Sequence, residues 1–449
     1  MARAKKEAAL TPEERLRAAL VPDWERPYKL PENWCWTTVG AINQYEGISA
    51  DPTKAKNETF ELYSVPSSAD NYPEIVLGAD IGSAKQSVKK GDVLLCKINP
   101  RINRVWKVSK YTDHSLLASS EWIVIRNSRL ISNYLMWCLR SPYFRGYMLS
   151  NVSGVGGSLM RAQPKFVQGY PIPLPPLAEQ QRIVDRIESL FVKLDEAKEK
   201  AQAVVDSFET RKAAILHKAF TGELTAKWRK EHDVGMESWE KYKFNELGTL
   251  ERGRSKHRPR NDPKLFGGKY PFIQTGDVAR SGMYITEHTQ TLSELGADQS
   301  KLFPKGTLCI TIAANIGDVS ILTYDCCFPD SVVGFTPNER TLSEYIYYLM
   351  STLQREIEAN APATAQKNIN LRILNDLQLD IPSVAEQTQI VNQVEYLFFQ
   401  EQHAKEAAEA VLEQIDLMKK SILVRAFRGE LGTNDPSEES AVELLKQLI

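Results

Sequence analysis

The sequence predicts an α+β protein in which two mixed α/β domains are separated by two long antiparallel helices that form a coiled coil with pseudo-two-fold symmetry. Three observations predict it: an internal repeat, a heptad-like apolar spacing within each copy, and two unlike blocks of similar size beside the copies. The predicted parts are an N-terminal helical extension, a first mixed α/β domain, a central helix with linker, a second such domain, a distal helix and a C-terminal tail, at residues 1–29, 30–173, 174–235, 236–381, 382–431 and 432–449.

The repeat is the strongest signal. Residues 175–224 align without a gap to residues 382–431, and 23 of the 50 positions are identical. Unrelated segments of average composition would share about three. Each copy opens with Pro-x-x-Ala-Glu-Gln and closes with Ala-Phe-x-Gly-Glu-Leu. The chain therefore contains a duplication.

Each copy predicts one long helix. Apolar residues recur at steps of four and three, the spacing of a coiled-coil seam. Glu401 replaces the leucine found at position 194, which breaks one layer of the second seam, and Gly222 and Gly429 stand where a helix C-cap is expected. The predicted seam residues are Ile183, Ile187, Leu190, Leu194, Val204, Phe208, Ile390, Val394, Leu397, Val411 and Ile415.

The two blocks share an outline. Each opens with tryptophan near a short strand, continues to a turn that leads into an apolar strand (residues 93–95 and 308–310), and later has an aromatic-rich helix (residues 134–139 and 345–350). Before the first block, Thr11 followed by Pro12 predicts a helix start. The polar residues 227–233 predict a linker between the halves.

Composition excludes several classes of protein. No apolar run approaches the roughly 18 residues that cross a bilayer, and the N-terminus lacks a secretion signal, so we expect a cytoplasmic protein without a membrane partner. The six cysteines form no CxxC motif and are expected to be buried thiols, with no metal site. A formal net charge of −1 argues neither for nor against nucleic acid, because a sum hides local patches.

A basic loop opens the second block. Five Arg or Lys residues fall within nine positions, a pattern that suits a phosphate backbone, while Gln and Asn amides farther along are typical readers of adenine. A merely solvated loop is the alternative. The candidate DNA-binding residues of this block are Arg252, Arg254, Lys256, His257, Arg258, Arg260, Lys269, Tyr270, Gln274, Thr275, Gln366, Lys367 and Asn368.

The first block has two weaker candidate segments. One interleaves basic and amide side chains with apolar ones, and the other follows a glycine-rich loop that lacks the lysine of a nucleotide-binding P-loop. A purely structural turn is an equal alternative for that loop. The candidates are Lys97, Asn99, Arg101, Asn103, Arg104, Lys107, Ser158, Arg161, Gln163 and Lys165.

Catalytic signatures are missing from the sequence. There is no P-loop, no HExxH, no finger-like Cys/His spacing and no Asn-Pro-Pro-aromatic motif of adenine methyltransferases. No catalytic residue is therefore predicted. The alternatives to a DNA-binding protein are a scaffold that links two protein-binding domains through the coiled coil, and, less favoured, a self-sufficient methyltransferase or nuclease.

Two blocks, each followed by a helix with these opening and closing motifs, resemble the specificity subunit of Type I restriction–modification systems. The resemblance covers nearly the whole chain and includes residues 224–229, 270–278, 365–370 and 438–445. The first block departs from the pattern, since residues 160–166 stand where the second block has residues 365–370.

The resemblance implies a prokaryotic complex. Its partners would be double-stranded DNA, two methyltransferase subunits that bind S-adenosylmethionine and methylate adenine, and two restriction subunits that use ATP and Mg. This chain would hold no cofactor and would supply sequence choice and scaffold. Two unlike readers on a pseudo-symmetric scaffold would read an asymmetric, bipartite site.

Overall fold

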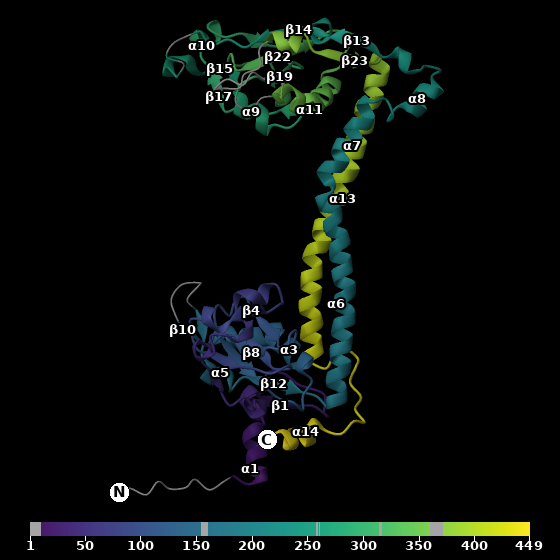
Figure 1. Ribbon diagram of the computed structural model, residues 1–449. Helices are drawn as coiled ribbons and strands as arrows, with labels where there is room; N and C mark the ends of the chain where they lie inside the picture. The colour runs from purple at the N-terminus through teal and green to yellow at the C-terminus, as the bar shows by residue number, and fades with distance from the viewer. Residues whose placement is uncertain (1–9, 154–159, 257–258, 260, 314–316, 360–370) are drawn as a thin grey trace. The chain divides into compact units, whose positions relative to one another are not determined.

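The computed structural model describes residues 10–153, 160–256, 259, 261–313, 317–359 and 371–449 (Figure 1). The chain divides into two compact units: Met1–Ala201 together with Ala410–Ile449, and Gln202–Glu409. Each unit contains one of the predicted blocks and a part of both copies of the repeat.

The first unit is built on two small sheets and two strand pairs. The sheets have the orders β2-β5-β8-β3-β4 and β7-β6-β9, and the pairs are β1-β12 and β10-β11. The apolar strand predicted at residues 93–95 is β6, which is fully buried at the centre of its sheet. The strands are β1 (Cys35–Thr38), β2 (Ser49–Ala50), β3 (Thr59–Tyr63), β4 (Glu74–Leu77), β5 (Lys85–Ser87), β6 (Val93–Cys96), β7 (Val105–Lys107), β8 (Ser115–Ala118), β9 (Trp122–Ile125), β10 (Val152–Ser153), β11 (Arg161–Ala162) and β12 (Pro171–Leu174).

Short helices surround these sheets and join the two ends of the chain. Thr11 caps α1 in a capping box, as predicted. The C-terminal α14 packs against α1, and the Arg15 guanidinium donates to the carbonyl of Ile449 at 3.4 Å. The helices of this unit are α1 (Pro12–Ala19), α2 (Val39–Ile42), α3 (Ser132–Arg140), α4 (Pro142–Ser150), α5 (Pro164–Val167) and α14 (Ala441–Leu448).

The second unit has a similar inventory in a different arrangement. Its sheets have the orders β14-β22-β19-β20-β16 and β17-β15-β21-β18, beside the pair β13-β23. The predicted apolar strand at residues 308–310 is the buried β19. The strands are β13 (Glu240–Lys243), β14 (Gly248–Arg252), β15 (Phe266–Phe272), β16 (Tyr284–Ile285), β17 (Gln290–Leu292), β18 (Leu302–Phe303), β19 (Leu308–Thr311), β20 (Val319–Leu322), β21 (Cys326–Cys327), β22 (Val332–Pro337) and β23 (Gln378–Ile381); the short helices are α8 (Ala226–Glu231), α9 (Thr275–Arg280), α10 (Glu294–Asp298), α11 (Ser343–Ala359) and α12 (Leu371–Asn375).

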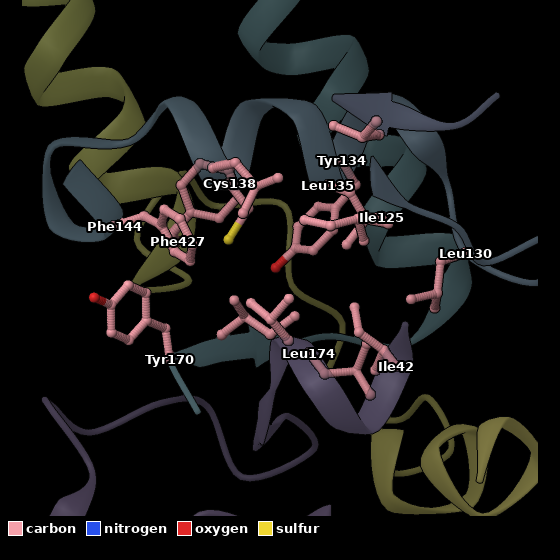
Figure 2. Close-up of a cluster of buried hydrophobic side chains, with 14 of the residues drawn as sticks. Ile42, Ile125, Leu130, Tyr134, Leu135, Cys138, Phe144, Tyr170, Leu174 and Phe427 are labelled. Carbon is pink, nitrogen blue, oxygen red and sulfur yellow. The ribbon is translucent and has the colours of Figure 1, made fainter. Parts of the chain in front are cut away.

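Both blocks are attached to the repeat in the same way. Their first and last strands pair antiparallel, β1 with β12 and β13 with β23, so the chain enters and leaves each block at one place. The Tyr134 hydroxyl donates to the carbonyl of Pro173 at 2.8 Å, and the Tyr345 hydroxyl donates to that of Asp380 at 3.5 Å. Phe427 and Phe220, the matching residues of the two repeat copies, pack edge-on against these tyrosines. Figure 2 shows Phe427 among the core residues around Tyr134.

The repeat forms long helices with one interruption. The second copy is a single helix, α13 (Val384–Phe427), whereas the first copy is divided into α6 (Leu177–Asp206) and α7 (Phe208–Phe220). At the break, the Ser207 hydroxyl donates to the carbonyl of Ala203. The N–H of Ser207 donates to the same carbonyl at 3.1 Å, and the Arg211 guanidinium donates to the carbonyl of Val204 at 3.1 Å, so these polar contacts lie at an interruption that the repeat alone did not predict.

Within each unit the helices lie side by side and run antiparallel (Figure 1). In the first unit, Lys419 pairs with Asp195, and Asp416 pairs with Lys198 at 3.9 Å, so the order along one helix is reversed on the other. In the second unit, Glu401 accepts from Arg211 at 2.5 Å. The glutamate that breaks the predicted seam therefore has a cationic partner on the facing helix.

The predicted seam residues are buried or half-buried, except at one position. Val411 is 45% exposed, while Ala408 and Ile415 on either side are buried and Leu412 is half-buried. Seven residues separate Ala408 from Ile415, and the seam residue between them can come three residues after Ala408, which is Val411, or four residues after it, which is Leu412. In the structure, Leu412 is the more buried of the two. Buried seam residues are Ile183, Ile187, Phe208, Ile390, Val394 and Ile415, and half-buried ones are Leu190, Leu194, Val204 and Leu397.

The Glu of the Pro-x-x-Ala-Glu-Gln motif is a buried anchor. Glu386 is 1% exposed and accepts hydrogen bonds from the Thr225 hydroxyl at 2.6 Å, Arg229 at 2.6 Å and the Trp239 indole at 3.1 Å. Arg229 belongs to α8, so the segment predicted as a polar linker is instead a helix with a buried, ion-paired arginine. A buried carboxylate requires such partners, because an unpaired buried charge is very costly.

Glu179, the matching residue of the first copy, has a similar set of partners. It is fully buried and accepts from the Thr433 hydroxyl at 2.6 Å and from Arg182 at 2.8 Å. Arg182 in turn binds Glu438 through two hydrogen bonds of 2.8 Å. Burial raises the pKa of Glu179, although Thr433 and Arg182 act in the opposite direction. In both units the segment that follows one long helix is therefore fixed to the first turn of the other.

The adjacent Gln fastens each block to its helix. The Gln180 side chain accepts from the backbone N–H of Ile131 at 3.2 Å, just before α3. The Gln387 side chain accepts from the N–H of Leu342 at 3.0 Å, just before α11. The Glu-Gln pair thus connects three parts of each unit: the helix start, the block and the segment after the opposite helix.

We expect Arg229→Ala to reduce the free energy of unfolding of its unit by about 3–5 kcal/mol, because it leaves Glu386 buried and uncompensated. The double variant Arg229→Met/Glu386→Gln should recover most of the loss, since Thr225 and Trp239 can still donate to the amide oxygen. Arg182→Ala is the matched control and should cost less, because Arg182 is 37% exposed. Denaturant titration followed by tryptophan fluorescence measures all three, and an equal loss for both single variants would contradict the prediction.

Gly429→Ala should cost more than Gly432→Ala. Both glycines have a positive φ, 73° and 72°, which costs an alanine about 1–2 kcal/mol at either position. Only at Gly429 would the added Cβ overlap the ring of Pro31, whereas nothing lies within 4 Å at Gly432. The same denaturant titration measures the free energy of unfolding of both variants. An equal loss for Gly429→Ala and Gly432→Ala would show that the contact with Pro31 has no effect.

Candidate nucleic-acid interface

The structure brings the two candidate segments of the first block together. The N–H of Asn99 donates to the carbonyl of Met160 at 2.8 Å, and the N–H of Ala162 donates to that of Lys97 at 2.8 Å. Glu121 lies between them, 3.1 Å from Arg161 and 4.0 Å from Lys97. Segments 60 residues apart therefore form one basic surface strip around a single carboxylate.

Four other side chains of this strip are also placed for contact with solvent. Arg101 and Lys165 are exposed, the latter with its ammonium 4.8 Å from the ring of Phe166. Gln163 is half-buried at the start of α5 (Pro164–Val167) without a capping hydrogen bond, and Arg104 is half-buried. These groups can donate to phosphates or base edges.

Two predicted contact residues have internal partners instead. Asn103 adopts φ 53°, and its amide donates to the carbonyls of Leu139 and Arg140 at 3.3 and 3.2 Å. The Lys107 ammonium donates to the side chain of Asn133 at 2.6 Å. These hydrogen bonds give both side chains structural partners within the block. Ser158 lies outside the described residues.

In the second block, three candidates converge on one cavity. Arg254, Lys256 and Gln274 line a cavity of about 210 Å³ whose apolar wall includes Phe266 and Phe272. The carbonyl of Arg254 accepts from the Ser300 hydroxyl at 3.2 Å, which holds the loop against this wall. Arg252 lies apart and donates to the carbonyl of Asp330. His257, Arg258, Arg260, Gln366, Lys367 and Asn368 lie outside the described residues.

Next to this cavity, the positive charge of Lys269 is partly neutralised by the carboxylate of Glu294. Glu294 lies 2.9 Å from the Lys269 ammonium and accepts from the Tyr270 hydroxyl at 2.9 Å. The hydrogen bond to Glu294 raises the pKa of Lys269. Gln274 donates to the Gln290 side chain at 2.7 Å, and Thr275 begins α9. A DNA phosphate could replace Glu294 as the partner of the exposed lysine.

Sequence reasoning did not find Glu121 and Glu294. Both are acidic side chains that hold the candidate cations in place, and no motif announces them. It also missed Arg140 and Arg145, which line a second cavity together with Arg104. These arginines follow the aromatic-rich helix in a segment whose periodicity predicts packing rather than binding.

The described residues offer no candidate metal site. Among them no group of three or more His, Cys, Asp or Glu side chains is placed to hold a metal ion. All six cysteines are buried, as predicted, and burial raises the pKa of Cys35 to about 12. No helix in the described ranges is long and apolar enough to cross a membrane.

Known proteins resemble this chain over most of its length. The family model described as Type I restriction modification DNA specificity domain matches residues 38–205 and 236–411. The Type I restriction enzyme EcoKI specificity subunit of Escherichia coli (strain K12) is 26% identical over 351 residues, which cover 72% of this chain and 73% of that protein. The putative type I restriction enzyme MjaX specificity subunit of Methanocaldococcus jannaschii is 23% identical over 422 residues, covering 90% and 95%.

A solved structure supports the same fold. The HsdS subunit from Thermoanaerobacter tengcongensis superimposes with a TM-score of 0.69 at 22% identity, covering 91% of this chain and 100% of that one. Because the family model matches both blocks and most of both repeat copies, the chain belongs to the specificity subunits of Type I restriction–modification systems and carries two target-recognition domains.

Proposed function

We propose that this chain reads an asymmetric, bipartite DNA sequence with one target-recognition domain per half-site, and that it holds two methyltransferase subunits that methylate adenine. The observation that carries the proposal is the attachment of two unlike blocks to matching positions of a duplicated scaffold. Tyr134 and Tyr345, and the Glu-Gln pairs of both copies, make the same kinds of contact in their own units.

The proposal extends to the orientation of the two readers. The ion pairs Lys198–Asp416 and Arg211–Glu401 support antiparallel packing of the long helices, each within its own unit. The duplication is the basis for proposing a pseudo-two-fold axis, and domains related by such an axis approach the duplex in opposite directions. Because the blocks differ in sequence, the two half-sites differ and an unread spacer separates them.

The chemistry of each block supports a distinct set of contacts. The first offers a strip with Lys97, Arg101 and Arg161, and the second offers Arg254 and Lys256 beside an apolar wall. Lysines in such places contact phosphates and determine affinity, whereas arginine and glutamine can also read base edges.

The proposed complex supplies the chemistry that this chain does not. The relatives are named as specificity subunits of restriction enzymes, which supports methyltransferase and restriction partners here. S-adenosylmethionine would bind to the methyltransferase subunits, and ATP with Mg to two restriction subunits. We assign no catalytic residue to this chain.

Arg254→Ala should weaken binding to the cognate duplex by about 1–3 kcal/mol and relax preference within one half-site only. Lys241→Ala is the matched control, since it removes one exposed positive charge from β13. Gel-shift titrations of the complex with methyltransferase subunits, at several salt concentrations, measure both. Equal effects of the two variants would show that the Arg254 loop is only solvated, and no binding by the wild type would favour a non-DNA scaffold.

Removal of one heptad from each helix, residues 196–202 and the facing 411–417, should shorten the spacer and leave both half-sites unchanged. Seven helical residues span about 10 Å, which corresponds to about three base pairs of B-DNA. Single-molecule sequencing of methylated adenines in cells that express the complex reads the site directly. Altered half-sites with an unchanged spacer would exclude the helices as the determinant of spacing.

A further inference from the structure

A cavity of about 420 Å³ lies where α13 passes the first block. Its lining includes four cationic side chains: Arg104 from the basic strip, Arg140 from α3, Arg145 from α4 and Lys420 from α13. Neither Asp nor Glu lines it. Four positive charges around one cavity repel one another unless an anion or water separates them.

These cations have no carboxylate partner among the described residues. None of Arg104, Arg140, Arg145 and Lys420 lies within 4.0 Å of a carboxylate oxygen in that part of the chain. Arg140 donates to the carbonyl of Val105 at 3.2 and 2.7 Å, and Arg145 donates to that of Arg101. Their backbone partners orient the guanidinium groups but leave their charge uncompensated.

Two features indicate that Arg140 and Arg145 could bind an anion that accepts hydrogen bonds. The Nε of Arg145 is buried and has no hydrogen-bond partner, although buried polar atoms are almost always paired. Burial lowers the pKa of Arg140, which means that removal from water disfavours its charged form. An anion in the cavity would offset both effects.

The matching cavity of the second unit has a different lining. It lies against α7, where Ala213 and Leu216 occupy the positions that match Lys420 and Leu423. Its described lining includes Ser351 and Thr352 and contains neither Lys nor Arg. The lysine of the first cavity therefore has no counterpart on α7, since Ala213 stands at the matching position.

We propose that the cavity lined by Arg104, Arg140, Arg145 and Lys420 binds a phosphate group. Guanidinium forks match two phosphate oxygens, and the lysine ammonium supplies a further point charge. A phosphodiester of the DNA backbone is one source, in which case the inference rests on the proposed function, and free inorganic phosphate is the other. A backbone phosphate held here would anchor the duplex without reading its sequence.

The first arm of the test uses the complex with methyltransferase subunits and its cognate duplex. Lys420→Ala should reduce the slope of log affinity against log salt by about 0.9 and weaken binding about three- to tenfold at low salt, with the methylated sequence unchanged. Arg145→Gln should act in the same direction, and Arg145→Lys should restore part of the slope. Lys193→Ala, which removes an exposed charge of α6 that does not line the cavity, is the control.

The second arm uses the full chain alone with inorganic phosphate. Calorimetric titration at fixed ionic strength compares the wild type with Lys420→Ala, a variant of an exposed side chain that should fold normally. If Lys420→Ala reduces the slope of log DNA affinity against log salt, the bound phosphate is a phosphodiester of the DNA backbone. Phosphate binding that the variant loses, with an unchanged DNA slope, identifies free phosphate. No difference from Lys193→Ala in either arm overturns the inference. Failure of the wild type to bind DNA would count against the proposed function, while the phosphate arm would still decide the cavity.

Discussion

Each unit depends on one buried carboxylate in the first turn of a long helix. Glu179 and Glu386 lie where water cannot reach them, and the positive end of the helix dipole alone does not compensate a buried charge. Their hydroxyl donors, Thr433 and Thr225, come from the segment that follows the opposite helix. The guanidinium donor of Glu386 comes from that segment too, whereas that of Glu179, Arg182, lies one turn along the same helix. Because breaking such a pair costs far more than an exposed ion pair, helix start and opposite helix end are held together.

This anchor lets two unlike domains occupy equivalent places. The glutamine next to each anchor binds the backbone just before α3 or α11, and the entry and exit strands of each block pair with one another. The interior of a block can therefore change without disturbing the contacts that attach it. In the proposed function, a constant attachment with a variable interior separates assembly from specificity.

Charge in this chain is arranged locally. The formal net charge of the chain is −1. Lys97 and Arg161 nevertheless share the carboxylate of Glu121, and Lys269 forms an ion pair with Glu294. The charged side chains described in the lining of the cavity beside Lys420 are all cationic. Exposed cations with a single carboxylate partner can exchange it for a phosphate at little cost. Half-buried arginines without a carboxylate are the more demanding case, because their backbone partners do not compensate their charge.

The sequence by itself determined the duplication, the long helices, the buried strands at β6 and β19 and the family, because repeated motifs and apolar periodicity are local properties of the chain. It could not determine which distant segments meet. Only the tertiary structure placed Lys97 beside Arg161, turned Asn103 inward, buried Arg229 in a segment that looked like a linker, and chose Leu412 over Val411 for the seam. The physical reason is that burial and pairing depend on neighbours from other parts of the chain, which periodicity does not encode.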